Sequence, residues 1–192
     1  MLKAIHPTGL AGLLLLEPQV FGDARGYFLE TFSQRELAEA DVPDAFVQDN
    51  LSCSVRGTLR GLHFQAPPHG QAKLVTVLEG LVRDVVVDLR VGSPTYGQHY
   101  AVDLSADNHL FLYVPVGFAH GFAVLSERCL FMYKCSQYYH KPSEGGLLWN
   151  DPALGIDWGL PPGTEPILSA KDLELPTLAA LQSPFVQAAL AQ

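Results

Sequence analysis

The middle of the chain is a run of short apolar segments separated by turn residues, and this feature limits the possible fold most strongly. Segments rich in Val, Leu, Phe and Tyr occupy residues 73–80, 81–90, 100–105, 109–115, 121–126 and 128–136. Such residues favour strands, and the Gly, Pro, Ser, Asp and Asn between the segments favour turns. Strands at this spacing predict an all-β sandwich or jelly roll.

Helical patterns are few and lie outside this run. Residues 33–40 read SQRELAEA, in which Ser33 can cap a short helix and Glu36 can complete a capping box. Residues 175–192 predict one or two short terminal helices. The Pro- and Gly-rich stretch before them predicts that residues from about 150 to 192 form a tail wrapping the barrel. The whole chain, residues 1–192, is therefore expected to be a single domain.

Charge and cysteine content restrict the partners and the compartment. The net charge of −8 argues against a broad basic surface for nucleic acid. No run reaches the roughly 20 apolar residues of a membrane helix. Residues 10–16, LAGLLLL, lack a cleavage site and are expected to form a strand rather than an export signal. The odd cysteine count, with Cys129 and Cys135 in apolar surroundings, favours reduced thiols and a cytoplasmic location.

The stretch RGLHFQAPPHGQAKL, residues 60–74, concentrates nitrogen-bearing side chains around a turn. A metal site is one interpretation, because small barrels of the cupin type hold iron, manganese or zinc on three or four ligands. His63 and His120 are two possible ligands, and no convincing third one follows. No metal is therefore expected. His69 lies in the turn and is expected to face solvent.

An anion site is a stronger interpretation. Arg60 and Lys73 flank the same turn, and Arg25 lies in another Gly-bounded turn. Arginine binds phosphate oxygens in a bidentate manner. On a regular strand Arg60 and His63 would point to opposite faces, so a bulge at Gly61 is needed to bring both into one cavity.

A proton-transfer site is the third interpretation. A neutral histidine with a pKa near ~6.5 is the usual base at physiological pH, and a carboxylate fixes its tautomer. Asp172 lies in a tail that could fold back to a histidine. Tyr133 and Tyr139 share strand parity and are candidate acids, although core or interface aromatics would show the same pattern.

Taken together, the motifs of the chain resemble the dTDP-4-dehydrorhamnose 3,5-epimerases over residues 2–175. The motifs that carry the resemblance, in order, are FGDARGYFLETF, FVQDNLSCS, GTLRGLHFQAPPHGQAKLV, VVVDLRVGSPTYG, VPVGFAHGF, YKCSQYY, WNDPALGIDW and ILSAKD.

The resemblance implies a cupin-type jelly-roll barrel (a double-stranded β-helix) with a few short peripheral helices and with no metal or other cofactor. It implies a homodimer that exchanges its N-terminal strands, residues from about 1 to 32. It also implies the substrate dTDP-4-dehydro-6-deoxy-D-glucose, inverted at C3 and C5 to give dTDP-4-dehydro-L-rhamnose for dTDP-L-rhamnose biosynthesis.

The resemblance assigns catalytic roles to four residues. His63 is the base, Asp172 is its carboxylate partner, Tyr133 is the proton donor and Lys73 lies near the developing enolate. The resemblance also implies that Tyr139 stacks on thymine, with Phe21 on the opposite face. The substrate-binding set is Phe21, Arg25, Glu30, Gln48, Asn50, Arg60, His120, Tyr139, Glu144 and Lys171, of which Phe21, Arg25 and Glu30 would reach into the partner's site.

Three positions depart from the commonest family pattern without removing a catalytic group. Gln137 replaces a frequent Asp, Gly145 a frequent Arg, and Phe64 a frequent Tyr. Three other functions stay open: an epimerase of one centre only, C3 or C5; a non-catalytic jelly roll that binds a sugar nucleotide; and a metal-dependent cupin oxygenase.

Overall fold

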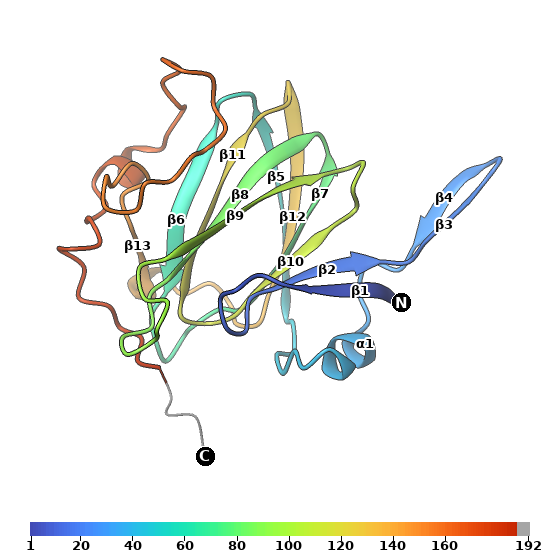
Figure 1. Cartoon of the computed structure of the whole chain (residues 1–192), viewed down its shortest axis with the longest axis horizontal. Coiled ribbons are helices and arrows are strands. Elements are labelled where there is room, and N and C mark those ends of the chain that lie inside the picture. Colours follow the sequence, from blue (N-terminus) through green and yellow to red (C-terminus); the bar gives the residue numbers. More distant parts are fainter. Residues whose placement is uncertain (188–192) are drawn as a thin grey trace.

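The computed structural model describes residues 1–187, which form a β structure with short helices at its edge (Figure 1). The strands are β1 (Leu2–Pro7), β2 (Leu14–Pro18), β3 (Val20–Asp23), β4 (Gly26–Leu29), β5 (Gln48–Val55), β6 (Leu59–Gln65), β7 (Lys73–Glu79), β8 (Leu81–Asp88), β9 (His99–Ser105), β10 (Phe111–Val114), β11 (Phe118–Val124), β12 (Arg128–Cys135) and β13 (Glu144–Gly146). The helical elements are α1 (Gln34–Glu39), η1 (Lys141–Ser143) and η2 (Ala170–Leu173).

Two sheets pack face to face in the jelly roll. One has the strand order β1-β2-β10-β7-β12-β5 and the other has the order β13-β6-β11-β8-β9. Apolar residues from both sheets meet between the layers, including Val75 and Phe131 from the first sheet and Val86 and Phe122 from the second. The six strand segments expected from the sequence correspond to β7–β12, so the predicted all-β jelly roll is confirmed.

The predicted helix after Ser33 is also confirmed, but the Glu36 carboxylate accepts from the N–H of Leu2 at 3.2 Å and does not complete the predicted capping box in the described structure. Ser33 caps α1 by accepting a hydrogen bond from the backbone N–H of Glu36. In residues 10–16, a turn occupies the first residues and β2 begins at Leu14. Within residues 1–187, no helix has the length and apolar character needed to cross a membrane.

The prediction of terminal helices is wrong for residues 175–187, which form turns and a short bridge from Val186 to Val91. Pro176 and Pro184 interrupt any helix here because proline lacks a backbone N–H donor. Residues 188–192, also part of that prediction, lie outside the described residues.

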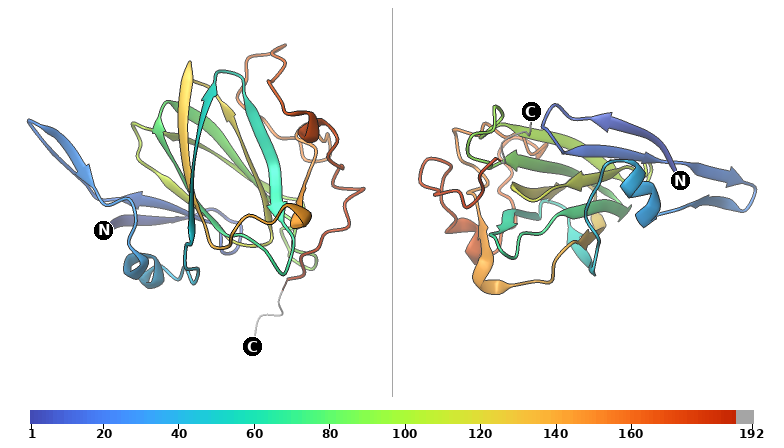
Figure 2. Two further views of the ribbon diagram at one scale, coloured as in Figure 1. Left: turned by 180° about the vertical axis from the view of Figure 1, so that it is seen from behind. Right: turned by 90° about the horizontal axis from the view of Figure 1, so that it is seen from below.

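The C-terminal segment covers the outer face of the β6-containing sheet. Trp158 and Phe185 pack there against Leu62 and Val87 in a second apolar cluster. Figure 2 shows this segment, in orange and red, running along the side of the sheet. Its packing matters for function because it brings η2 against β6.

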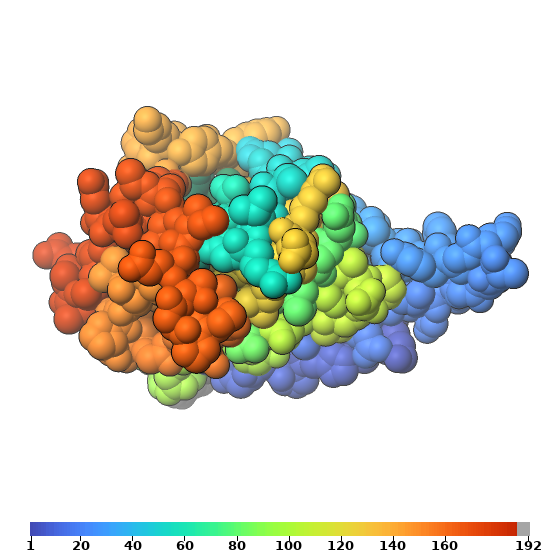
Figure 3. All heavy atoms as spheres, turned by 90° about the horizontal axis from the view of Figure 1, so that it is seen from above, coloured from blue at the N-terminus to red at the C-terminus, as the bar shows by residue number. Residues whose placement is uncertain are grey.

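A hairpin of β3 and β4 projects from the other side of the molecule, as the space-filling view in Figure 3 shows in blue. Its large side chains are exposed: Phe21 by 51%, Tyr27 by 63% and Phe28 by 69%. A projecting arm with aromatic side chains in water is typical of a segment that contacts a partner.

Candidate active site

A cavity of about 630 Å³ lies between the two sheets. Alternate residues of a strand point inward, between the two sheets. In the core these inward-facing residues are apolar, and further along the same strands, at the cavity, they are polar. On β7 the row runs from Val77 and Val75 to Lys73, and on β12 it runs from Phe131 to Tyr133. The cavity is therefore the continuation of the core into polar side chains.

Strand β6 supplies both Arg60 and His63 to this cavity. The pairing of β6 with β11 shifts register between His120 and Phe122, which is the irregularity predicted at Gly61. Gly61 has φ +141°, and a Cβ there would lie 2.5 Å from the Cα of Gly121. Only glycine allows this close approach, which lets side chains that a regular strand would separate face one cavity.

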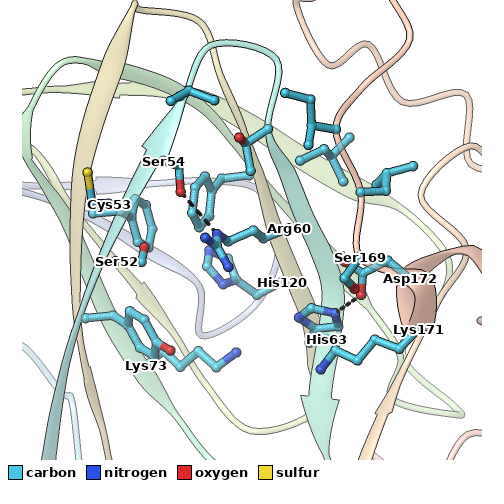
Figure 4. Close-up of a pocket in the computed structure, with 18 of the residues that line it drawn as sticks. Ser52, Cys53, Ser54, Arg60, His63, Lys73, His120, Ser169, Lys171 and Asp172 are labelled. Atoms are coloured by element: carbon cyan, nitrogen blue, oxygen red, sulfur yellow. Dashed lines mark hydrogen bonds and ion pairs between the residues drawn. The ribbon is translucent and has the colours of Figure 1, made fainter.

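His63 and Asp172 form a hydrogen-bonded pair. The distance from His63 Nε2 to Asp172 Oδ1 is 2.6 Å, and the Asp172 residue is only 2% exposed (Figure 4). Burial acts to raise the pKa of Asp172, but the hydrogen bond and charge of His63, together with Ser169 and Lys171, outweigh burial and hold that pKa below its usual value. Among residues 1–187, no group hydrogen-bonds to Nδ1 of His63, so this nitrogen remains available to a ligand.

Lys73 and Tyr133 line the cavity from β7 and β12, which belong to the sheet opposite β6. Burial lowers the pKa of Lys73, and the carboxylates of Asp84 and Glu144 partly oppose this effect. Burial also raises the pKa of Tyr133, which keeps its phenol protonated. A base and a protonated phenol therefore lie on opposite walls.

A second histidine–carboxylate pair lies deeper in the cavity, and its acid was missed by the sequence analysis. His120 Nε2 lies 3.0 and 2.9 Å from the two carboxylate oxygens of Asp84. Asp84 is fully buried, and burial raises its pKa against the opposing effect of His120. The available signal was an acid within an apolar strand, on the same parity as Val82 and Val86.

Serines of β5 add polar groups that were also missed. Ser54 Oγ accepts a hydrogen bond from Arg60 Nε at 3.1 Å, which leaves the terminal nitrogens of the guanidinium for a ligand. Ser52 also lines the cavity, and within the described residues its buried Oγ has no hydrogen-bond partner.

A neighbouring hollow of about 310 Å³ shares His63, Lys73, Tyr133 and Glu144 with the main cavity. It adds other residues of the predicted substrate-binding set: Gln48, Asn50 and Tyr139. Tyr139 is 55% exposed, and its hydroxyl donates to Glu144 at 3.1 Å. Lys171 pairs with Glu144 at 2.5 Å.

Three residues of the predicted set are not brought to this cavity. Phe21 and Arg25 belong to the β3–β4 hairpin, where Arg25 pairs with Asp23, and Glu30 pairs with the N-terminal ammonium group. Any role for them in a site requires a second subunit. His69 differs from its expected exposure: it is half-buried, and its ring stacks on His140 with centroids 3.8 Å apart.

His63, Lys73, Tyr133 and Arg60 thus converge on one cavity. Within residues 1–187, no cluster of three or more His, Cys, Asp or Glu side chains could hold a metal ion. The fold and the site define a cupin-type jelly roll with groups for acid–base chemistry. The sequence model for dTDP-4-dehydrorhamnose 3,5-epimerase matches residues 7–180, and the chain belongs to this family of isomerases.

Individual relatives agree with this placement. The dTDP-4-dehydrorhamnose 3,5-epimerase of Salmonella typhimurium is 50% identical over 172 residues, covering 89% of this chain and 93% of the relative. The crystal structure of a Legionella pneumophila dTDP-6-deoxy-D-glucose-3,5-epimerase with dTDP-4-keto-L-rhamnose is 46% identical, with a TM-score of 0.91 and coverage of 96% and 99%. A 3'-monoepimerase from Streptomyces bikiniensis, in complex with dTDP-quinovose, is 36% identical, with a TM-score of 0.84 and coverage of 91% and 87%.

Proposed function

We propose that the chain epimerises dTDP-4-dehydro-6-deoxy-D-glucose at C3 and C5 to give dTDP-4-dehydro-L-rhamnose. The observation that carries this proposal is the carboxylate-backed His63 on one cavity wall with Tyr133 and Lys73 on the other. The hydrogens at C3 and C5 are acidic because both carbons adjoin the C4 ketone, so each centre can be inverted by proton transfer alone.

Each inversion then takes two steps. Nδ1 of His63 removes the proton from one face, and the electron pair of the C–H bond moves into an enolate with its charge on O4. The Lys73 ammonium stabilises that charge in a cavity where burial strengthens electrostatic interactions. Tyr133 protonates the same carbon from the opposite face, which inverts the centre.

Asp172 and Asp84 support this chemistry in different ways. Asp172 holds the proton on Nε2 of His63, keeps Nδ1 as the basic nitrogen, and stabilises the imidazolium after proton abstraction. Asp84 fixes the ring of His120 at the deep end of the cavity, where the imidazole can contact the sugar.

In this proposal the nucleotide occupies the neighbouring hollow and the adjoining part of the main cavity, which Arg60 and Lys171 line. Arg60 binds the diphosphate, with its guanidinium oriented by Ser54. The exposed ring of Tyr139 provides a stacking surface for thymine, and Gln48, Asn50, Glu144 and Lys171 complete the polar lining. Binding energy from the nucleotide then holds the sugar within reach of His63.

The proposal includes a homodimer in which the β3–β4 arm completes the partner's site. The exposed aromatic side chains of the arm support this arrangement, as does the distance of Arg25 from its own cavity. Arg25 would add a second cation to the diphosphate, and Phe21 would cover the free face of the thymine. The proposed cytoplasmic location agrees with three free cysteines, two of them buried.

A second candidate is inversion at one centre only. The similarity to the 3'-monoepimerase favours it as the alternative, because proton abstraction next to a ketone serves either activity. The proposed function is tested with the purified chain, the 4-keto substrate and a reductase that accepts only the L-configured product.

The parent chain should give steady turnover in this coupled assay. His63→Ala should abolish turnover and keep the affinity for dTDP, because His63 acts on the sugar, while the proposed diphosphate and base contacts, Arg60 and Tyr139, stay in place. Near-full activity of His63→Ala would show that His63 is not the base. If the parent chain binds dTDP but gives no turnover, the result would favour a non-catalytic binding protein.

A further inference from the structure

The loop that carries Tyr139 runs from the end of β12 to η1 and has no regular secondary structure around the tyrosine. Its backbone polar groups therefore need partners from elsewhere. Two glutamine side chains provide them. Gln48 Oε1 accepts from the N–H of Tyr139 at 3.1 Å.

Gln65, at the end of β6, holds the groups on either side of Tyr139. Its Oε1 accepts from the N–H of His140 at 2.7 Å, and its Nε2 donates to the carbonyl of Tyr138 at 3.3 Å. These groups belong to the two peptide planes that meet at the Tyr139 Cα. Fixing both planes fixes the backbone dihedral angles of Tyr139, and hence the direction in which its side chain leaves the loop.

Gln65 is suited to this task because it is itself rigid. It is only 4% exposed, and its Nε2 also donates to the carbonyl of His69 at 2.7 Å. Its amide thus joins the turn after β6 to the loop after β12. The stacked rings of His69 and His140 join the same two segments.

We propose that Gln65 is a positioning residue for Tyr139: its buried amide holds the tyrosine ring where a nucleoside base can stack on it. The inference rests on the proposed function, since it assigns to Tyr139 the recognition of the base. Base–aromatic stacking depends on the plane and position of the ring, so a loop that samples several conformations binds the base less tightly.

Gln48 also holds the peptide plane between Tyr138 and Tyr139, but the amide of Gln65 is the side-chain partner of the next plane, between Tyr139 and His140. Gln71 donates to the carbonyl of Gln137, and Ser136 bonds to Ala72, but both contacts lie before Tyr138. The bond from Tyr139 to Glu144 restrains only the tip of the ring. Replacement of Gln65 therefore leaves the loop attached to the barrel and the Tyr139 N–H bonded to Gln48, but it releases the peptide plane between Tyr139 and His140.

The test is a double-mutant cycle on dTDP affinity, measured by calorimetry with the full chain. Gln65→Met keeps the length of the side chain and removes its hydrogen bonds. We expect it to weaken dTDP binding about tenfold, equivalent to about 1.4 kcal/mol. Tyr139→Ala should also weaken binding, and in the Tyr139→Ala background Gln65→Met should have no further effect.

Ser126→Ala is the matched control for a general effect on loops. Ser126 Oγ bridges two segments by accepting from the N–H of Leu81 at 2.8 Å and donating to the carbonyl of Arg128 at 2.7 Å, away from the cavity. The Ser126→Ala variant should have a lower thermal stability than the parent chain and an unchanged affinity for dTDP. With the 4-keto substrate, Gln65→Met should raise KM by a larger factor than it lowers kcat.

The outcomes separate this inference from the proposed function. If the parent chain does not bind dTDP, the proposed function fails. If Tyr139→Ala weakens binding while Gln65→Met binds like the parent, the positioning role is refuted and the proposed function stands. Additive losses in the double variant would also refute it, because Gln65 would then act independently of Tyr139.

Discussion

Replacement of Asp172 by asparagine tests the base assignment with little change of shape. The carboxylate lies 2.6 Å from His63 Nε2 and is almost completely buried. Asparagine fills the same volume and can still accept one hydrogen bond. It carries no charge, so it cannot stabilise the imidazolium that forms when His63 takes a proton.

The magnitude follows from this geometry. Loss of one partner from a buried, hydrogen-bonded charge pair costs about 2–5 kcal/mol, and the full loss is felt only after His63 becomes charged. About 3–4 kcal/mol of lost transition-state stabilisation corresponds to a decrease in kcat of about 10²–10³-fold. The affinity for dTDP should not change, because Asp172 faces His63 and not the nucleotide hollow.

The assay compares kcat of Asp172→Asn with that of Asp151→Asn in the reductase-coupled reaction. Asp151 is a matched control because it lies in the same C-terminal segment, is 4% exposed and accepts from the N–H groups of Ala153 and Leu178 outside the cavity. Its variant should lose stability and keep its kcat. A kcat of Asp172→Asn within tenfold of the parent, or an equal loss in Asp151→Asn, would refute the reasoning.

Three further predictions concern stability and the partner subunit. Burial alone would raise the pKa of Asp88, but hydrogen bonds led by Arg90 lower that pKa to about 2. The ionised carboxylate therefore adds about 2 kcal/mol to the free energy of unfolding above pH ~4. This contribution is lost as the pH falls toward 2. Urea unfolding at several pH values should show that Asp88→Asn loses less stability than the parent chain as the pH falls. An equal loss of stability in both chains would contradict this assignment. Gly61→Ala should destabilise the chain by at least about 2 kcal/mol and lower kcat, because a Cβ would overlap Gly121; parental stability in urea would disprove the close approach. Arg25→Ala should raise KM by about tenfold with little change in kcat, as expected for a cation that binds only the diphosphate, and an unchanged KM would exclude the arm from the partner's site.

The sequence predicts the fold well because strand patterning is local. Alternating β-branched and aromatic residues between turn residues define β7–β12 without knowledge of tertiary contacts. The prediction of helices in residues 175–187 is wrong because the conformation there depends on tertiary contacts rather than on the local pattern. Their apolar residues suit a short helix, but Leu178, Leu181 and Phe185 instead pack on the second apolar cluster, and tertiary burial decides the conformation.

The site was predictable where a single residue carries the signal. Gly61 marked the irregularity of β6, and His63 was a candidate base by its chemical type. The residues alone did not single out Asp172 as its carboxylate partner; the family resemblance did, and the two side chains are hydrogen-bonded. Asp84 was missed because strand parity was not applied to the charged residues within the apolar segment at 81–90. Gln65 gives no signal in the sequence, since its contacts join two loops that meet only in the folded barrel.

The central claim, proton transfer at both carbons next to the ketone, is tested most directly by isotope exchange. The chain is incubated with dTDP-4-dehydro-6-deoxy-D-glucose in deuterium oxide, and the C3 and C5 hydrogens are followed by NMR. The account predicts deuterium at both carbons, at rates that account for turnover, and no exchange in the His63→Ala variant. Exchange at one carbon only would replace the proposed activity by single-centre epimerisation, and exchange at neither would contradict the account.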